Sequence, residues 1–258
     1  MGVLNVTPDS FSDGGRYFDL AAALDLASRM VDAGVDIIDV GGESTRPGAR
    51  AVSVAQETHR VLPVIEAIKR ELGARVSVDT MKADVARQAV QAGADMINDV
   101  SGFGDPGMLS VARKSGAPVV AMHMRGTPRT MQRRTDYDDL VATVAGFLED
   151  CVGSAIAAGV SDDKIIVDPG IGFGKSAAGS MRILKHLPDF RRVGRPILIG
   201  ASRKSFIGKS LDLPVDERLE GSLAVAAYAS AQGAHVVRTH DVGATVRVVR
   251  MIDAIRQS

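Results

Sequence analysis

DAGVDIIDVGG, residues 32–42, carries the pattern that decides the fold: a helix-like segment ends at Gly34, and the apolar run that follows ends in polar residues. The same arrangement recurs in QAGADMIND (91–99), in AQGAHVVRTH (231–240) and at four further junctions. A glycine just past a helix is typical of a left-handed C-terminal cap, a conformation that glycine adopts without steric cost. We therefore expect helices and strands to alternate along the chain. The glycines concerned are Gly34, Gly73, Gly93, Gly116, Gly159, Gly194 and Gly233.

Eight short runs rich in valine and isoleucine are the expected strands. They are apolar on both faces, which is typical of parallel strands covered by helices. Their number favours a closed barrel, and polar residues follow the strands from the first to the last, whereas an open doubly wound sheet concentrates such residues at one switch point. We predict an α/β fold, a single (β/α)8 TIM barrel domain spanning residues 1–258. The expected strands are 1–5, 35–40, 75–79, 95–98, 118–123, 164–168, 196–200 and 234–238.

The composition suits one globular domain and argues against other classes of protein. Hydrophobic residues make up 45% of the 258 residues, and 31 basic residues balance 31 acidic ones, so we expect no nucleic-acid partner. We identify no signal peptide and no apolar run near the roughly 18 residues that span a membrane, and we expect no membrane partner. The lone Cys151 is expected to be a buried structural thiol in a cytoplasmic protein. The chain begins inside its first expected strand, so we expect a few upstream residues to be missing.

Acidic and amide side chains end several of the strands. Asp39, Asp79, Asp99 and Asp168 each end an apolar run, and Asn98 precedes Asp99. For any single residue the simpler interpretation is that it caps the following helix or bonds loop amides, but the set favours a shared pocket, because all strands of a barrel end at one mouth. A carboxylate accepts two parallel N–H bonds from an amidine-like or guanidine-like edge, as in guanine or pterin. Metal coordination is the alternative, although no His/Asp or His/Glu set has ligand spacing.

Two polar, glycine-containing loops follow strand ends. Residues 5–15 and 41–48 are long for such connections and have the composition of lids that order around a ligand, the alternative being ordinary surface loops. Residues 168–175 resemble a phosphate-binding loop only in their glycines, because the P-loop spacing is missing. His123 either lines the pocket or is a core histidine with its hydrogen bonds satisfied, and we favour the core.

Basic residues follow the last two expected strands, where barrel enzymes often bind phosphate. Arg46, Arg238 and His240 are therefore candidates for holding a phosphate or pyrophosphate. Mg²⁺ and the side-chain oxygen of Asn5 would assist them.

Eight segments spread over the chain, taken in order, point to one family: NVTPDSFSDGG (5–15), DVGGESTRPGA (39–49), VDT (78–80), INDVSG (97–102), MHMRGTP (122–128), DPGIGFGK (168–175), SRKSFIG (202–208) and VRTHDV (237–242). Together they resemble dihydropteroate synthase. The resemblance implies a (β/α)8 barrel and a homodimer. It also implies the joining of 6-hydroxymethyl-7,8-dihydropterin pyrophosphate to p-aminobenzoate, which gives 7,8-dihydropteroate and pyrophosphate in folate synthesis.

The resemblance also implies roles for individual positions. The residues expected to grip the pterin ring are Asp79, Asn98 and Asp168, with Lys204 reaching its oxygen and ring nitrogen. Those expected to form the pocket walls are Met122, Phe173 and Gly200. Those expected to hold the pyrophosphate are Asn5, Arg46, Arg238 and His240, with Mg²⁺ at Asn5. Those expected to form the p-aminobenzoate site are Thr45, Pro47, Ser202 and the stem of Lys204. The chain departs from the family at Ile171, where phenylalanine is frequent, and at Thr239, where valine is common.

The expected chemistry suits these residues. The bond to be broken joins the pterin methylene to a pyrophosphate oxygen, and the electron-rich dihydropterin can stabilise positive charge at that methylene. The incoming aniline is largely unprotonated at neutral pH, so no strong base is needed, in keeping with the lack of a Ser/His/Asp or Cys/His arrangement. Three alternatives stay open: a pterin-binding corrinoid methyltransferase, a non-catalytic pterin-binding homologue, and a Schiff-base aldolase in which Lys204 is the reactive amine.

Overall fold

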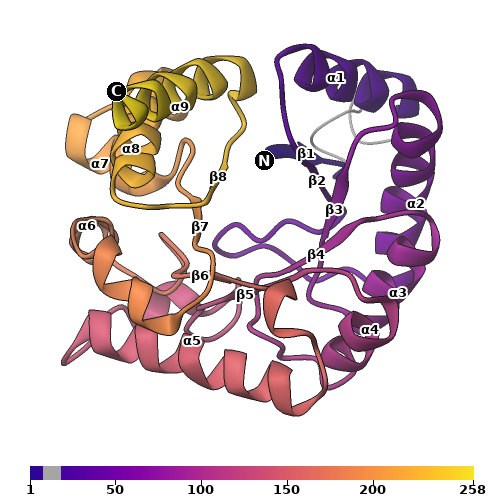
Figure 1. Cartoon of the computed structure of the whole chain (residues 1–258), viewed down its shortest axis with the longest axis horizontal. Helices are drawn as coiled ribbons and strands as arrows, with labels where there is room; N and C mark the ends of the chain where they lie inside the picture. Colours follow the sequence, from indigo (N-terminus) through magenta and orange to yellow (C-terminus); the bar gives the residue numbers. More distant parts are fainter. Residues whose placement is uncertain (8–18) are drawn as a thin grey trace.

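Parallel strands alternate with helices along the part of the chain that the structure, a computed structural model, describes: residues 1–7 and 19–258. The strands form a ring with the helices outside it (Figure 1). The strands are β1 (Gly2–Asn5), β2 (Ile38–Gly41), β3 (Val76–Asp79), β4 (Met96–Asp99), β5 (Val119–Met122), β6 (Ile165–Asp168), β7 (Leu198–Gly200) and β8 (Val236–Arg238). The α-helices are α1 (Leu20–Asp32), α2 (Val54–Glu71), α3 (Ala83–Gln91), α4 (Met108–Ser115), α5 (Leu140–Ala157), α6 (Ala177–Lys185), α7 (Ser205–Leu211), α8 (Leu219–Ala231) and α9 (Val242–Gln257). Short 3-10 helices are η1 (Met131–Arg133), η2 (Asp162–Lys164), η3 (Leu187–Val193) and η4 (Val215–Glu217).

The barrel is closed through two narrow seams. Strands β1 to β6 pair in sequence order, all parallel, and β7 pairs with β8. At the first seam the backbone N–H of Val167 in β6 donates to the carbonyl of Pro196, just before β7 (2.9 Å). At the second seam Val3 donates to the carbonyl of Thr239 (2.9 Å), and Thr239 donates to that of Met1 (3.0 Å). The predicted (β/α)8 TIM barrel is therefore confirmed.

The helix ends follow from the glycine pattern. Each of the seven predicted cap glycines has a positive φ, from 59° at Gly73 to 108° at Gly93. The start of α2 is equally local: the side chain of Ser53 accepts the N–H of Gln56, and the side chain of Gln56 accepts the N–H of Ser53, which forms a capping box. These signals place each strand start within a few residues of its predicted position.

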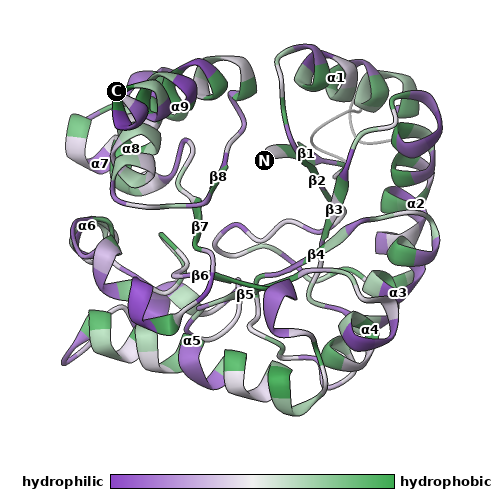
Figure 2. Cartoon of the chain, viewed as in Figure 1, coloured by the Kyte–Doolittle hydropathy of each residue, from purple (hydrophilic) through white to green (hydrophobic). Residues whose placement is uncertain are grey.

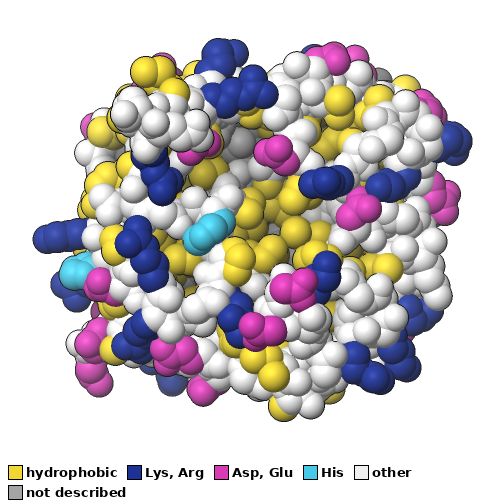
Figure 3. Space-filling model, viewed as in Figure 1, with side chains coloured by type: hydrophobic (Ala, Val, Ile, Leu, Met, Phe, Trp, Pro, Cys, Tyr) yellow, Lys and Arg dark blue, Asp and Glu magenta, His cyan; other side chains and the backbone are white. Residues whose placement is uncertain are grey.

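The inside of the ring is filled rather than open. Met1 and the strand residues Met96, Val120 and Leu198 are buried there in one apolar cluster. The strands are the most hydrophobic part of the chain in Figure 2, and the space-filling view shows apolar side chains in the centre with charged ones around them (Figure 3). The barrel interior is thus a packed core that holds the strand ends in fixed positions.

Helix α5 corrects one expectation from the sequence. Its 18 residues are long and apolar enough, by length and composition, to cross a membrane, which makes it the one such helix among the described residues. It packs against β5, β6 and α6, and it buries Val144, Leu148 and Val152 in the core cluster. Those contacts are typical of a core helix in a water-soluble barrel.

Candidate active site

The carboxyl ends of the strands bring distant side chains together, as the barrel requires. Arg238, the last residue of β8, contacts two carboxylates from the opposite end of the chain. Its Nε donates to Oδ2 of Asp39 (2.6 Å) and its Nη2 donates to Oδ2 of Asp79 (2.7 Å). The amide Nδ2 of Asn98 also donates to Oδ2 of Asp39 (3.0 Å). Four strands therefore contribute to one polar cluster, which we call the strand-end cluster (Asp39, Asp79, Asn98 and Arg238).

The cluster contains acceptors that have no partner. Asp39 is fully buried and Asp79 nearly so, yet Oδ1 of each makes no hydrogen bond among the described residues. Burial raises the pKa of Asp79, opposed by the guanidinium of Arg238 and reinforced by Asp39. Leaving a buried carboxylate oxygen unpaired is costly. The geometry is therefore suited to a ligand that brings N–H donors.

Asp168 and Lys204 form the facing part of the mouth. Oδ1 of Asp168, which ends β6, accepts the N–H of Gly170 (2.7 Å). Nζ of Lys204 donates to the carbonyl of Ile171 and lies 4.2 Å from the centre of the Phe173 ring. Burial lowers the pKa of Lys204 to about 7, with Asp168 opposing this effect and Arg238 adding to it. A ligand lying against Phe173 would thus meet a carboxylate and an amine.

Lys175 is a residue of this region that sequence reasoning missed. It is 3% exposed, and its Nζ lies 2.8 Å from Nδ1 of His123 and donates to the carbonyls of Gly170 (2.9 Å) and Phe173 (3.0 Å). The loop of residues 169–175 is thus wound around one buried amine. The signal was available, because three glycines at alternate positions, followed by lysine, allow the backbone to curl around that lysine. His123 has its pKa lowered to about 3 by burial and by Lys175, and it is the satisfied core histidine that we favoured.

The loops after β7 and β8 are joined to each other. Oγ of Ser202 accepts the backbone N–H of His240 (3.2 Å) and lies 3.1 Å from its Nδ1. Arg203 donates from Nε and Nη2 to the two carboxylate oxygens of Asp241 (2.9 and 2.5 Å). Desolvation and the charge of Arg238 lower the pKa of His240. An exposed, neutral histidine at the rim can gain a proton when an anion binds next to it.

The loop after β2 carries three of the predicted site residues. Thr45 is half-buried, whereas Arg46 and Pro47 are exposed. Among the described residues, no hydrogen bond or ion pair joins these three to the cluster. The loop instead contacts the segment after β5, where the N–H of Gly48 donates to the carbonyl of Pro128 (3.1 Å). Within the predicted lid at 41–48, Gly41 lies against Asp79, where an added Cβ would be 3.4 Å from Cβ of Asp79.

The remaining predicted residues have mixed surroundings. Met122 is 2% exposed and packs with Met124, Met131 and the half-buried Phe173. Gly200 ends β7, where an added Cβ would lie 3.7 Å from Cβ of Arg238, an ordinary contact distance. Asp99 is a second strand-end acid, besides Asp168, that lies outside the strand-end cluster. It accepts the N–H groups of Ser101 (2.8 Å) and Phe103 (3.0 Å), so the simpler interpretation, a carboxylate that bonds loop amides, is correct there.

At Asn5 the protein offers Mg²⁺ a single side-chain oxygen. Asn5 ends β1, half-buried, beside Gly41. The described residues include no group of three His, Cys, Asp or Glu side chains that could hold a metal ion. Mg²⁺ usually keeps several waters and binds one or two protein oxygens together with substrate phosphates, so a single amide oxygen suits a metal that arrives with a polyphosphate. Residues 8–15 of the first predicted loop lie outside the described residues.

Comparison with known proteins gives one consistent family. The profile described as pterin binding enzyme matches residues 1–240. A dihydropteroate synthase of Synechocystis sp. is 49% identical over 257 residues, covering 99% of this chain and 89% of that protein. A Yersinia pestis dihydropteroate synthase, solved with a sulfonamide drug, has a TM-score of 0.95 at 45% identity, covering 100% of this chain and 94% of that one. A Xanthomonas albilineans dihydropteroate synthase, solved with 4-aminobenzoic acid, has a TM-score of 0.93 at 43% identity, covering 100% and 92%.

Proposed function

The chain belongs to the dihydropteroate synthase family of pterin-binding enzymes, and from this premise we propose how the mouth of its barrel carries out the reaction. The enzyme is a transferase of folate biosynthesis. It joins the methylene of 6-hydroxymethyl-7,8-dihydropterin pyrophosphate to the amine of p-aminobenzoate. The observation that carries the proposal is the strand-end cluster, in which buried carboxylate oxygens have no partner among the described residues and an arginine lies beside them.

We assign the pterin ring to Asp79, Asn98 and Asp168. The unpaired Oδ1 of Asp79 would accept N–H bonds from the amino-pyrimidinone edge, which presents donors in parallel, and Asp168 would accept from the same ring. Lys204 would donate to the ring oxygen and nitrogen. Phe173 and Met122 would pack against the ring, and Gly200 would leave room for it.

The leaving group would be held by Arg238, His240 and Arg46. Arg238 uses Nε and Nη2 on Asp39 and Asp79. Its Nη1 makes no hydrogen bond among the described residues, which leaves that group for a phosphate oxygen. His240 would accept a proton as the charge of the leaving group grows, and Arg46 would close over it from the loop after β2. Cations fixed where charge develops lower the barrier, because they need no reorganisation during the reaction.

The bond change needs little proton transfer. The C–O bond between the methylene and pyrophosphate breaks with its electron pair going to the leaving group, the aniline nitrogen bonds to the methylene, and the N–H proton is lost to solvent. The aniline would be held by Thr45, Pro47, Ser202 and the stem of Lys204, so its nitrogen lies near the methylene. Mg²⁺, bound with Asn5, would supply charge neutralisation on the pyrophosphate. The protein's main contribution is thus position and charge.

The deciding experiment is pyrophosphate release by the purified chain. We expect release when dihydropterin pyrophosphate, p-aminobenzoate and Mg²⁺ are all present, and none when p-aminobenzoate is left out. Pyrophosphate release that does not depend on p-aminobenzoate would refute the assigned reaction. A requirement for a cobalamin partner would favour the corrinoid methyltransferase instead.

We further propose a homodimer formed through one side of the barrel. Large apolar side chains that are 43–60% exposed lie on α7, α8 and α9, which pack against one another in order: Leu211, Tyr228, Met251 and Ile255. Helix α8 is apolar over most of its surface, which is typical of a helix covered on both sides. We expect Tyr228→Glu to shift sedimentation from dimer to monomer. The control is Ile156→Glu on α5, at a side chain of similar exposure, which should leave the dimer intact.

Finally, we propose a cytoplasmic location. Cys151, the lone cysteine, is a buried free thiol, and burial raises its pKa to about 12. A buried thiol with so little thiolate is structural, which suits a reducing compartment.

A further inference from the structure

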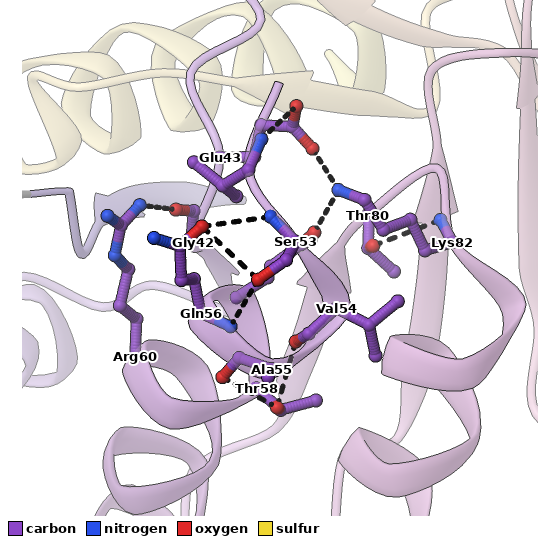
Figure 4. Close-up of polar contacts among 12 residues, drawn as sticks. Gly42, Glu43, Ser53, Val54, Ala55, Gln56, Thr58, Arg60, Thr80 and Lys82 are labelled. Carbon is purple, nitrogen blue, oxygen red and sulfur yellow. Dashed lines mark hydrogen bonds and ion pairs between the residues drawn. The ribbon is translucent and has the colours of Figure 1, made fainter. Parts of the chain in front are cut away.

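One lysine outside the strand-end cluster lies between two buried glutamates. Nζ of Lys82, the residue before α3, is 2.5 Å from Oε2 of Glu57 and also contacts Oε2 of Glu43. The side chain of Glu57 is 0% exposed, that of Glu43 is 7% and that of Lys82 is 22%. Figure 4 shows Glu43 and Lys82 reaching toward each other across the start of α2. Two consecutive βα units, β2–α2 and β3–α3, therefore meet at this single amine.

The charges at this point do not balance without Lys82. Two carboxylates share one ammonium, and Oε1 of Glu57 makes no hydrogen bond among the described residues. Burial disfavours the ammonium, but hydrogen bonds to Glu43 and Glu57 outweigh burial and raise the pKa of Lys82. Lys82 is thus charged throughout the physiological range. Its removal would leave two desolvated carboxylates facing each other, which is strongly unfavourable.

Glu43 connects this charge cluster to the loop after β2. Its Oε1 accepts the N–H of Val52 (3.3 Å), so Glu43 joins the two ends of residues 43–52. The base of the loop is also fixed at Gly42, whose carbonyl accepts from Nη1 of Arg60 (2.8 Å) (Figure 4). An added Cβ at Gly42 would lie 3.1 Å from Cγ of Glu57, so little space remains there. The loop itself carries Thr45, Arg46 and Pro47.

We propose that Lys82 is a positioning residue for the reaction: through Glu43 it fixes the base of residues 43–52 and thereby places Thr45, Arg46 and Pro47 over the mouth. This role rests on the proposed function, because it acts through residues assigned to p-aminobenzoate and pyrophosphate. Lys82 itself touches neither substrate. The pterin ring, held by Asp79, Asn98 and Asp168, does not depend on this loop.

The test compares Lys82→Met with Lys69→Met. Lys69 also pairs with a carboxylate, Asp95 (2.9 Å), but at a more exposed site away from the loop. We expect Lys82→Met to raise KM for p-aminobenzoate about tenfold and to leave pterin affinity within twofold. Trypsin should cleave after the exposed Arg50 about tenfold faster, whereas Arg46 is protected because proline follows it. Lys69→Met should change neither quantity.

A purely structural role would lower the melting temperature and leave KM and cleavage after Arg50 unchanged, and that result overturns the proposal. So would an equal loss of affinity for both substrates. If Lys82→Met does not fold, Glu43→Gln decides, because it keeps the side-chain shape and the bond to Val52 but removes the charge. For Glu43→Gln we expect KM for p-aminobenzoate and the rate of cleavage after Arg50 each to rise about threefold. If both stay unchanged, the proposal is overturned. Tryptic cleavage needs no activity, so its outcome is separable from failure of the proposed reaction in the wild type.

Discussion

Replacing Gly170 by alanine should disrupt the pterin side of the mouth. Gly170 has a φ of +70°, and an added Cβ would lie 2.0 Å from the carbonyl oxygen of His123 and 3.1 Å from its carbonyl carbon. Both neighbours are backbone atoms at the end of β5, so they cannot turn aside as a side chain could. Gly194 is a matched control, because its φ is +71° and nothing lies within 4 Å of the added Cβ.

The expected cost follows from the difference between the two positions. An alanine with positive φ costs about 1–2 kcal/mol, which is all that Gly194→Ala should lose. At Gly170 the loop must also move. That movement strains the bonds from its N–H to Asp168 (2.7 Å) and from Lys175 to its carbonyl (2.9 Å), each worth roughly 1.5–3 kcal/mol because a charged group takes part. The total is about 4–8 kcal/mol, or a melting temperature lower by roughly 8–32 °C.

The assay is denaturant unfolding of both variants at one pH, followed by calorimetric titration with the pterin substrate for whichever variants fold. We expect the free energy of unfolding to fall by at least about 2 kcal/mol more in Gly170→Ala than in Gly194→Ala. We also expect Gly170→Ala to bind pterin weakly. Equal stability of the two variants, together with unchanged pterin affinity, would refute the reasoning.

Three further predictions concern the charged residues of the mouth. Asp168→Asn keeps an acceptor for Gly170 but loses the charge, and we expect pterin affinity to fall about 100-fold by calorimetry, with the exposed Asp189→Asn as a neutral control. Arg238→Met removes the cation that pairs with Asp39 and Asp79, so unfolding should become easier by about 3–5 kcal/mol and turnover should fall more than pterin binding; adding Asp79→Asn should restore part of the stability but not turnover. Burial lowers the pKa of Lys204 to about 7 from its ordinary 10.5, so its stability contribution is complete above pH 10.5 and is lost as the pH falls toward 7. Lys204→Met should therefore raise the free energy of unfolding at pH 7 by about 1–3 kcal/mol, gain nothing near pH 10.5 and abolish turnover, as thermal melts and rate assays would report.

The fold was predictable because its signals are local. A positive φ after a helix favours glycine independently of the tertiary structure. The seven cap glycines therefore indicated where helices end and strands follow. The convergence of Asp79, Asn98 and Arg238 followed from closure of the barrel, which places all parallel strand ends at one mouth. Strand starts were less well predicted: β2 begins at Ile38 rather than at residue 35, because Val35 still belongs to the helix cap, where its N–H bonds to Met30.

The partners of individual charges were not predictable. The sequence suggested Arg238 for pyrophosphate and Asp79 for pterin, but their ion pair depends on side-chain lengths across the barrel. Lys175 was missed because its role depends on how residues 169–175 curl around it. Lys82 was missed because its two glutamates lie 39 and 25 residues earlier in the preceding βα unit, and only packing brings them within reach of one amine.

The two seams of the barrel have a consequence for how the enzyme is assembled. Strands β7 and β8 are joined to the rest of the ring by single bridges, Val167 to Ile197 and Gly2 to Thr239, while the other six strands pair continuously. Residues 197–258 are therefore the segment most weakly attached to the rest of the barrel. This segment carries Lys204, Arg238 and the apolar surface of α7 to α9. A second subunit bound to that surface would stabilise the association of this segment with the rest of the barrel. Catalytic competence would then depend on protein concentration, although no residue of the partner need enter the pocket.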